Sequence, residues 1–198
     1  MRKFIISIDA GTTSNRSILF DLKGKPVFSS QKEFTQFFPK SGWVEHNPEE
    51  IWRTTVKTLK DVIQKAKKLR GEILNIGITN QRETTVLWDK RTGKPVYNAI
   101  VWQDRRQEEF CAKLRKQNKD TMIFNKTGLL IDSYFSGTKI KWILDNVPKA
   151  KKLMKSNQLL FGTIDSFLIW RFTKGKIHAT DATNASRTMI YNITSNRR

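Results

Sequence analysis

The chain has 198 residues, of which 38% are hydrophobic and 11% aromatic. This composition excludes a disordered polar segment and predicts one globular domain or slightly more. No run of 18 apolar residues occurs, which excludes a transmembrane helix, and the first apolar run ends at Asp9, too early for a signal peptide. The one cysteine, Cys111, has no internal partner for a disulfide, so we expect a reducing, cytoplasmic compartment.

The net charge of +19 raises the question of a nucleic-acid-binding surface. Basic residues gather at positions 65–70 and 149–155, both on expected helices. Neither group forms a single stripe or alternates with exposed aromatic residues, as a surface for single-stranded nucleic acid does. We therefore interpret the charge as solvated surface lysines, and keep a basic nucleic-acid-binding module as an alternative.

The predicted elements begin with strands at residues 4–8, 17–20 and 27–28, which form a small antiparallel meander. A helix is predicted to start with Asn47 as N-cap and Pro48 at the first helical position, and to be closed by Gly71. The later predicted elements are strands at residues 73–79, 84–88, 96–102 and 159–161, and helices at residues 104–117, 140–147 and 163–170. This alternation predicts an α/β fold.

A polar turn follows the first predicted strand. A carboxylate at the end of a buried strand, such as Asp9, requires a partner, and hydrated Mg²⁺ is a suitable one. The turn supplies backbone N–H groups, hydroxyls and a positive charge, which are groups that bind phosphate. The candidate phosphate-binding residues are Gly11, Thr12, Thr13, Ser14 and Arg16. An ordinary hairpin turn capped by Asp9 remains the alternative.

A second polar stretch contains Arg82 and Glu83, flanked by two apolar β-segments. If the chain turns there, the two side chains can serve one pocket, with Arg82 as the partner of a buried Glu83. Together they offer donors and acceptors without net charge, which suits a neutral polyol. Trp102 and Tyr134 are candidates for an aromatic wall beside it. The alternatives are an exposed ion pair and two ordinary core aromatics.

A metal cluster is not expected, because His46 and His178 have no second histidine or cysteine at ligand spacing. Cys111 lies among apolar residues of a predicted helix and is interpreted as a core thiol.

With these segments in view, the chain resembles the amino-terminal part of glycerol kinases, within the carbohydrate-kinase family that has the actin and hexokinase type of ATPase fold. The resemblance runs from about residue 4 to about residue 193. Ala10, Asn15 and Ser133 depart from the usual Gln, Ser and Pro, and Ser133 is expected to loosen the loop before Tyr134. The matching segments are residues 9–16, 41–48, 77–85, 97–103, 134–144, 160–163 and 183–189.

The resemblance implies a ribonuclease-H-like domain, with a mixed sheet flanked by helices. Residues 1–198 are expected to form most of the first, substrate-side domain, incomplete at the carboxyl end. The nucleotide-binding second domain and the aspartate that accepts the proton are expected outside the chain, so no catalytic residue is assigned within it. Residues 189–193 have the alternation of a strand and are expected to form an unfinished, apolar edge.

For function, the resemblance implies phosphorylation of glycerol by ATP to give sn-glycerol 3-phosphate and ADP. Arg82, Glu83 and Tyr134 are implied to hold glycerol, with Trp102 packed against it. The turn after Asp9 is implied to face the ATP phosphates, with Asp9 near Mg²⁺. The intact enzyme is expected to be a homo-oligomer, and this chain alone to be nearly inactive. A kinase for another polyol or sugar, or a non-catalytic remnant, remains an alternative.

Overall fold

Residues 2–195 are described in the computed structural model, and they fall into two units. The first unit contains residues 2–36 and 47–81, and the second contains residues 37–46 and 82–195. Within residues 2–195 there is no helix that is both long enough and apolar enough to cross a membrane.

The first unit is built on a four-stranded mixed sheet. Its strands are β1 (Arg2–Ala10), β2 (Ser14–Asp21), β3 (Pro26–Glu33) and β6 (Gly71–Asn80), in the order β3-β2-β1-β6. β2 is antiparallel to both β1 and β3, whereas β6 is parallel to β1. The predicted meander is therefore confirmed, and the parallel fourth strand confirms the α/β class with a mixed sheet.

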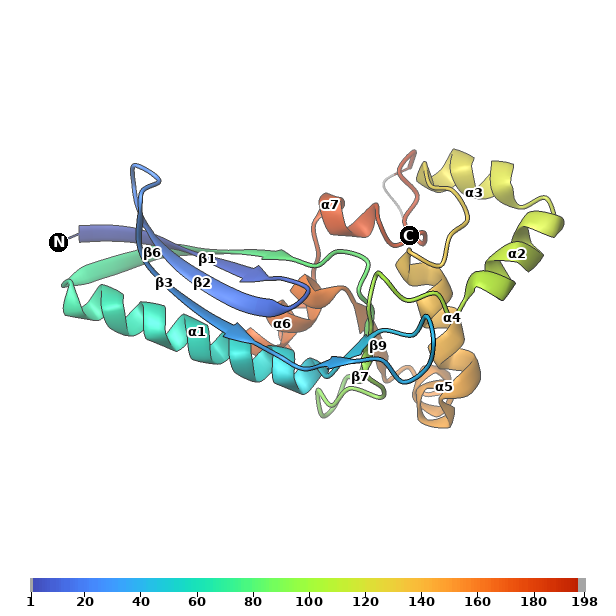
Figure 1. The fold of residues 1–198 in the computed structure, drawn as a ribbon, viewed down its shortest axis with the longest axis horizontal. Helices are drawn as coiled ribbons and strands as arrows, with labels where there is room; N and C mark the ends of the chain where they lie inside the picture. The colour runs from blue at the N-terminus through green and yellow to red at the C-terminus, as the bar shows by residue number, and fades with distance from the viewer. Residues whose placement is uncertain (1, 196–198) are drawn as a thin grey trace. The chain divides into compact units, whose positions relative to one another are not determined.

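Helix α1 (Pro48–Lys68) lies along one face of this sheet (Figure 1). The predicted start is confirmed, because the Asn47 side chain accepts a hydrogen bond from the Glu49 backbone N–H at 2.9 Å. Alternate residues of β1 point toward the helix, and Ile6, Ile8 and Val62 are completely buried. Burying these aliphatic side chains is the main stabilising contribution between helix and sheet, at about 2 kcal/mol for each.

The carboxyl end of α1 differs from the prediction. The helix ends at Lys68, and the residue with a left-handed backbone is Arg70, with a φ of 52°. Gly71 instead begins β6, where an added Cβ would lie 2.1 Å from the Phe4 ring. Gly71 is therefore required by the close approach of Phe4 and not by the end of the helix.

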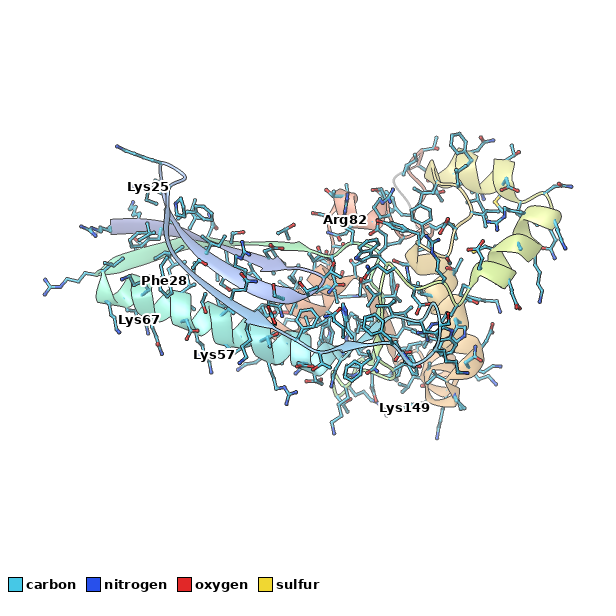
Figure 2. All side chains as sticks on the ribbon, in the orientation of Figure 1. Lys25, Phe28, Lys57, Lys67, Arg82 and Lys149 are labelled. Atoms are coloured by element: carbon cyan, nitrogen blue, oxygen red, sulfur yellow. The ribbon has the colours of Figure 1, made fainter. Side chains whose placement is uncertain are left out.

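Many of the basic residues are solvent-exposed on helices. Figure 2 shows Lys57 and Lys67 projecting from α1 on the side away from the sheet. Lys65, Lys67 and Lys68 lie in the last turn of α1, where positive charge interacts favourably with the helix dipole. Exposed lysines are compatible with either interpretation of the charge, so the solvated surface stays a prediction.

The second unit has short strands and several helices. Strand β7 (Val86–Asp89) pairs antiparallel with β9 (Leu159–Gly162), and β5 (Glu45–His46) with β8 (Ala99–Ile100). Strand β4 (Gln36–Phe37) lies where the chain passes from the first unit to the second. The helices are α2 (Glu108–Lys116), α3 (Asp120–Thr127), α4 (Ser136–Asn146), α5 (Pro148–Lys155), α6 (Ile164–Phe172) and α7 (Ala182–Ala185).

Two predicted elements are shorter than expected. The strand predicted at 96–102 is reduced to β8. Just before it, the side chains of Tyr97 and Asn98 donate hydrogen bonds to the Glu45 carboxylate at 2.7 and 2.9 Å. The helix predicted from Asp104 begins at Glu108. Asp104 instead accepts hydrogen bonds from the backbone and guanidinium of Arg106, which fold the chain into a turn.

The strand expected at residues 189–193 is absent from the part of the chain that the structure describes. Met189 has a φ of 61°, which breaks an extended backbone. The Ile193 N–H then donates to the Lys126 carbonyl at 2.9 Å, so the segment turns back onto the end of α3. Ile190 and Ile193 are 46% and 45% exposed, so apolar surface is present there without a strand.

The role of Gly71 gives a stability prediction. Gly71→Ala should lower the free energy of unfolding by about 2 kcal/mol, because the new methyl group overlaps the Phe4 ring. Urea denaturation of the chain measures this loss. Arg70→Gly is the matched control, and should cost less than about 1 kcal/mol because glycine adopts a left-handed backbone freely. A larger loss at position 70 than at position 71 would contradict this account of the turn.

Candidate active site

The predicted phosphate-binding turn lies in the first unit, between β1 and β2. In the register of the two antiparallel strands, the backbone of Asp9 lies opposite that of Arg16. The Gly11 N–H donates to the Ser14 carbonyl at 3.0 Å and closes the turn. Gly11 is tightly placed, because an added Cβ would lie 3.1 Å from that same carbonyl. The turn therefore joins two antiparallel strands in a compact form.

Two glutamines that the sequence did not indicate hold this turn in place. The Gln81 side chain donates to the Gly11 carbonyl at 2.9 Å. Gln31, on β3, donates to the Ser14 hydroxyl and accepts from Arg16 Nε, both at 2.9 Å. Gln31 thus holds the Ser14 hydroxyl and the Arg16 guanidinium on the same face of β2, where both could bind one anion.

Asp9 is half-buried at the end of β1, directly before the turn. Its carboxylate makes no hydrogen bond or ion pair with any residue between positions 2 and 195. Within the same range no cluster of three or more metal-binding side chains occurs. A carboxylate without a protein partner suits a cation that keeps most of its water ligands, as Mg²⁺ does. Asp9 thus fits the predicted metal, and its role stays a prediction.

Arg82 and Glu83 belong to the second unit and have very different environments. Glu83 is 2% exposed and has a φ of 64°, so the chain does turn at this point. Arg82 is exposed and forms no ion pair or hydrogen bond with the described residues. The expectation that Arg82 is the partner of Glu83 is wrong, because the Glu83 carboxylate is bound by another arginine.

The partner of Glu83 is Arg187, which the sequence analysis did not single out. Arg187 Nε donates to Glu83 Oε1 at 2.5 Å, and its guanidinium lies over the rings of Tyr134 and Phe135. Burial alone lowers the pKa of Arg187, but the hydrogen bond and charge of Glu83 outweigh it, so the net pKa is raised. Arg187 lies in the segment 183–189 that carries the family resemblance, and this was the one available signal.

Two of the aromatic candidates lie beside this ion pair. The ring centroids of Trp102 and Tyr134 are 5.6 Å apart. The backbone N–H of Trp102 donates to the hydroxyl of Thr84, the residue after Glu83. Thus Glu83, Trp102 and Tyr134 are brought together in the second unit. Arg82 is adjacent in sequence but makes no hydrogen bond, ion pair or ring contact with the described residues.

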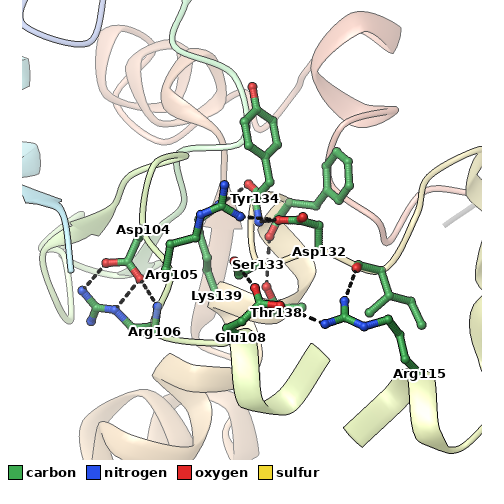
Figure 3. A network of polar contacts seen from close by, with 12 residues as sticks. Asp104, Arg105, Arg106, Glu108, Arg115, Asp132, Ser133, Tyr134, Thr138 and Lys139 are labelled. Atoms are coloured by element: carbon green, nitrogen blue, oxygen red, sulfur yellow. Dashed lines mark hydrogen bonds and ion pairs between the residues drawn. The ribbon is translucent and has the colours of Figure 1, made fainter. Parts of the chain in front are cut away.

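The loop that carries Tyr134 is held from both sides (Figure 3). Asp132 Oδ1 accepts from the Tyr134 N–H at 2.7 Å and from Arg105 Nη1 at 3.0 Å. Ser133 is 1% exposed and donates to the Glu108 carboxylate at 3.3 Å. Ser133 thus ties the loop to α2, and its effect on the mobility of the loop stays a prediction.

The Glu83–Arg187 pair gives a prediction with a matched control. Arg187→Ala should lower the free energy of unfolding at pH 7 by about 3 kcal/mol, because it leaves a buried carboxylate without a partner. Arg82→Ala, which removes the same charge from an exposed side chain, should change it by less than about 0.5 kcal/mol. Urea denaturation of both variants measures the difference.

A double variant is a further check on the same pair, because neutralising position 83 removes the unpaired buried charge. Glu83→Gln in the Arg187→Ala background should recover part of the stability at pH 7. Equal losses for the variants at positions 82 and 187 would contradict the pairing.

Comparisons with known proteins identify the family. Residues 4–197 match the model of the N-terminal domain of the FGGY family of carbohydrate kinases. The chain is 60% identical over 192 residues to the glycerol kinase of Malacoplasma penetrans, covering 97% of this chain and 38% of that protein. It is 58% identical over 193 residues to the glycerol kinase of Alkaliphilus metalliredigens, and this match covers 98% of this chain and 39% of that protein.

Solved structures agree with this assignment. Plasmodium falciparum glycerol kinase with ADP superimposes with a TM-score of 0.93 at 38% identity, covering 99% of this chain and 39% of that chain. The gluconate kinase of Lactobacillus acidophilus gives a TM-score of 0.83 at 26% identity, and this match covers 98% of this chain and 37% of that chain. The chain thus spans about 39% of the length of the relatives that it matches. With the mixed sheet of the first unit and the match over residues 4–197, the chain belongs to the FGGY family of carbohydrate kinases and corresponds to its N-terminal domain.

Proposed function

We propose that the protein to which this chain belongs is a glycerol kinase, which transfers the terminal phosphoryl group of ATP to glycerol and gives sn-glycerol 3-phosphate and ADP. The observation that carries the proposal is the group formed by Glu83, Trp102 and Tyr134, which combines a buried carboxylate with an aromatic wall. The identity of 58–60% to two glycerol kinases supports this substrate above other polyols and sugars.

In this proposal the residues of the second unit bind and orient the polyol. The Glu83 carboxylate accepts hydrogen bonds from glycerol hydroxyls, and the exposed Arg82 guanidinium donates to hydroxyl oxygens. The rings of Trp102 and Tyr134 pack against the carbon chain, and the Tyr134 hydroxyl adds one more hydrogen bond. Holding the attacking hydroxyl in this way supplies the positioning on which phosphoryl transfer depends.

The turn of the first unit is assigned to the ATP phosphates and the metal. The backbone N–H groups, the hydroxyls of residues 12–14 and the Arg16 guanidinium would bind phosphate oxygens. Asp9 would hold Mg²⁺ through its water ligands, and the ion when bound neutralises charge on the phosphates. The group that accepts the proton is assigned outside residues 1–198. The cytoplasmic location and the homo-oligomeric state belong to the same proposal.

The direct test is a chimera in which this chain replaces the matched 192-residue segment of the Malacoplasma penetrans glycerol kinase. We expect it to phosphorylate glycerol at a rate close to that of the parent enzyme, and xylulose or gluconate far more slowly. A chimera that melts cooperatively but transfers no phosphate to glycerol would refute the substrate assignment. If the chain instead bound duplex DNA at physiological salt, the alternative of a basic nucleic-acid module would be favoured.

Asp9 gives a separate prediction for the metal. In the chimera, Asp9→Asn should lower Mg²⁺-dependent turnover by about tenfold or more, because the carboxylate that orients the hydrated ion is lost. The melting temperature should hardly change, since Asp9 has no partner among the described residues. Glu33→Gln is the control, because it removes the same charge from an exposed residue paired with Ser14 on the neighbouring strand. A large drop in melting temperature with unchanged turnover would show that Asp9 is structural.

A further inference from the structure

Lys139, in the first turns of α4, is a buried lysine that the proposed mechanism does not use. Its side chain is 1% exposed and lies below Tyr134 in Figure 3. The Nζ atom donates to the Tyr134 carbonyl, and lies 3.5 Å from the Glu83 carbonyl. One amine thus bridges two segments that are about 50 residues apart in sequence, and each segment carries a residue assigned to glycerol.

The burial of Lys139 is not balanced by an ion pair. Lys139 has no carboxylate within ion-pair distance among residues 2–195. Burial lowers its pKa to about 7, and the more distant charges of Asp104, Glu83 and Asp132 only partly oppose this, while Arg105 adds to it. A methionine of similar length would avoid the desolvation cost altogether. The polar contacts of Lys139 are therefore confined to the two carbonyls that it joins.

The two carbonyls depend on Lys139 to different degrees. The Glu83 carbonyl also accepts hydrogen bonds from Ser136 Oγ at 3.0 Å and Thr85 Oγ1 at 3.1 Å. Among residues 2–195, by contrast, no other donor reaches the Tyr134 carbonyl. Losing the amine would therefore leave the Glu83 turn in place and remove the hydrogen bond that ties the Tyr134 carbonyl to it.

We propose that Lys139 is a positioning residue of the glycerol site, which fixes the Tyr134 loop against the Glu83 turn and thereby sets the distance between the phenol and the carboxylate. This inference rests on the proposed function, since it assigns a substrate-specific effect to a residue that does not touch the substrate. It predicts that the affinity for glycerol depends on Lys139 and that the affinity for ATP does not.

The kinetic test uses the chimera described above. Lys139→Met should raise the KM for glycerol about tenfold, because a loop that lost its hydrogen bond must be ordered by the substrate. The KM for ATP should stay within about twofold of the parent value. The control is Lys141→Met on the same helix, whose exposed amine pairs with Asp145 at 2.5 Å, and it should leave both constants unchanged. An unchanged KM for glycerol in Lys139→Met would overturn the proposal.

Two measurements on the chain itself separate this inference from the proposed function. Replacing the buried charge should leave the melting temperature unchanged or raised. Loss of a purely structural lysine would instead lower the melting temperature and raise both KM values. In Lys139→Met, amide hydrogen exchange should accelerate at residues 133–135. It should remain slow around Thr85, which forms a β-bridge with Ile100 of β8. Unchanged exchange at residues 133–135 would overturn the inference even if the chimera phosphorylates glycerol. Faster exchange in a chain whose chimera is inactive would refute only the proposed substrate.

Discussion

The arrangement of the candidate site depends on Glu83 being held at both ends. Its carbonyl accepts hydrogen bonds from Thr85, Ser136 and Lys139, while its carboxylate is bound by Arg187. The left-handed backbone at this residue costs about 1 kcal/mol or more, and such conformations persist only where surrounding contacts fix them. The contacts come from a neighbouring residue, from α4 and from the segment after α7, so the turn exists only when these parts of the second unit are assembled.

The fold of the first unit was largely predictable from local sequence patterns. A short apolar run before Asp9, and Asn47 followed by Pro48, are signals whose physical causes lie within a few residues. The second unit has strands of only two to four residues, and side chains that are distant in sequence contact each other beside them. The Glu45 carboxylate, for example, accepts hydrogen bonds from Tyr97 and Asn98, which are more than 50 residues away in sequence. No local sequence pattern predicts such a contact.

The residue types of the site were readable from the sequence, but their pairing was not. Arg82 and Glu83 are neighbours in the chain, so pairing them was the simplest hypothesis. The actual partner, Arg187, is 104 residues from Glu83 and reaches it only through the tertiary fold. The roles of Gln31 and Gln81 could not be predicted for the same reason. In the sequence, a glutamine that supports a distant turn cannot be distinguished from an ordinary surface glutamine.

Under the proposed function, the observed pairing suits a polyol better than the predicted one. Had Arg82 and Glu83 bound each other, each would have used hydrogen-bonding capacity that a substrate needs. Because Arg187 bonds Oε1 of Glu83, the carboxylate is neutralised and its other oxygen remains able to accept, while all the N–H donors of Arg82 are unengaged by the described residues. A triol has hydroxyls that both donate and accept, and so can satisfy an acceptor and a donor at the same time. In the proposed function, a ligand that lacks one of these hydroxyls would leave a polar group of the site unpaired, and that cost would make the site selective for a triol.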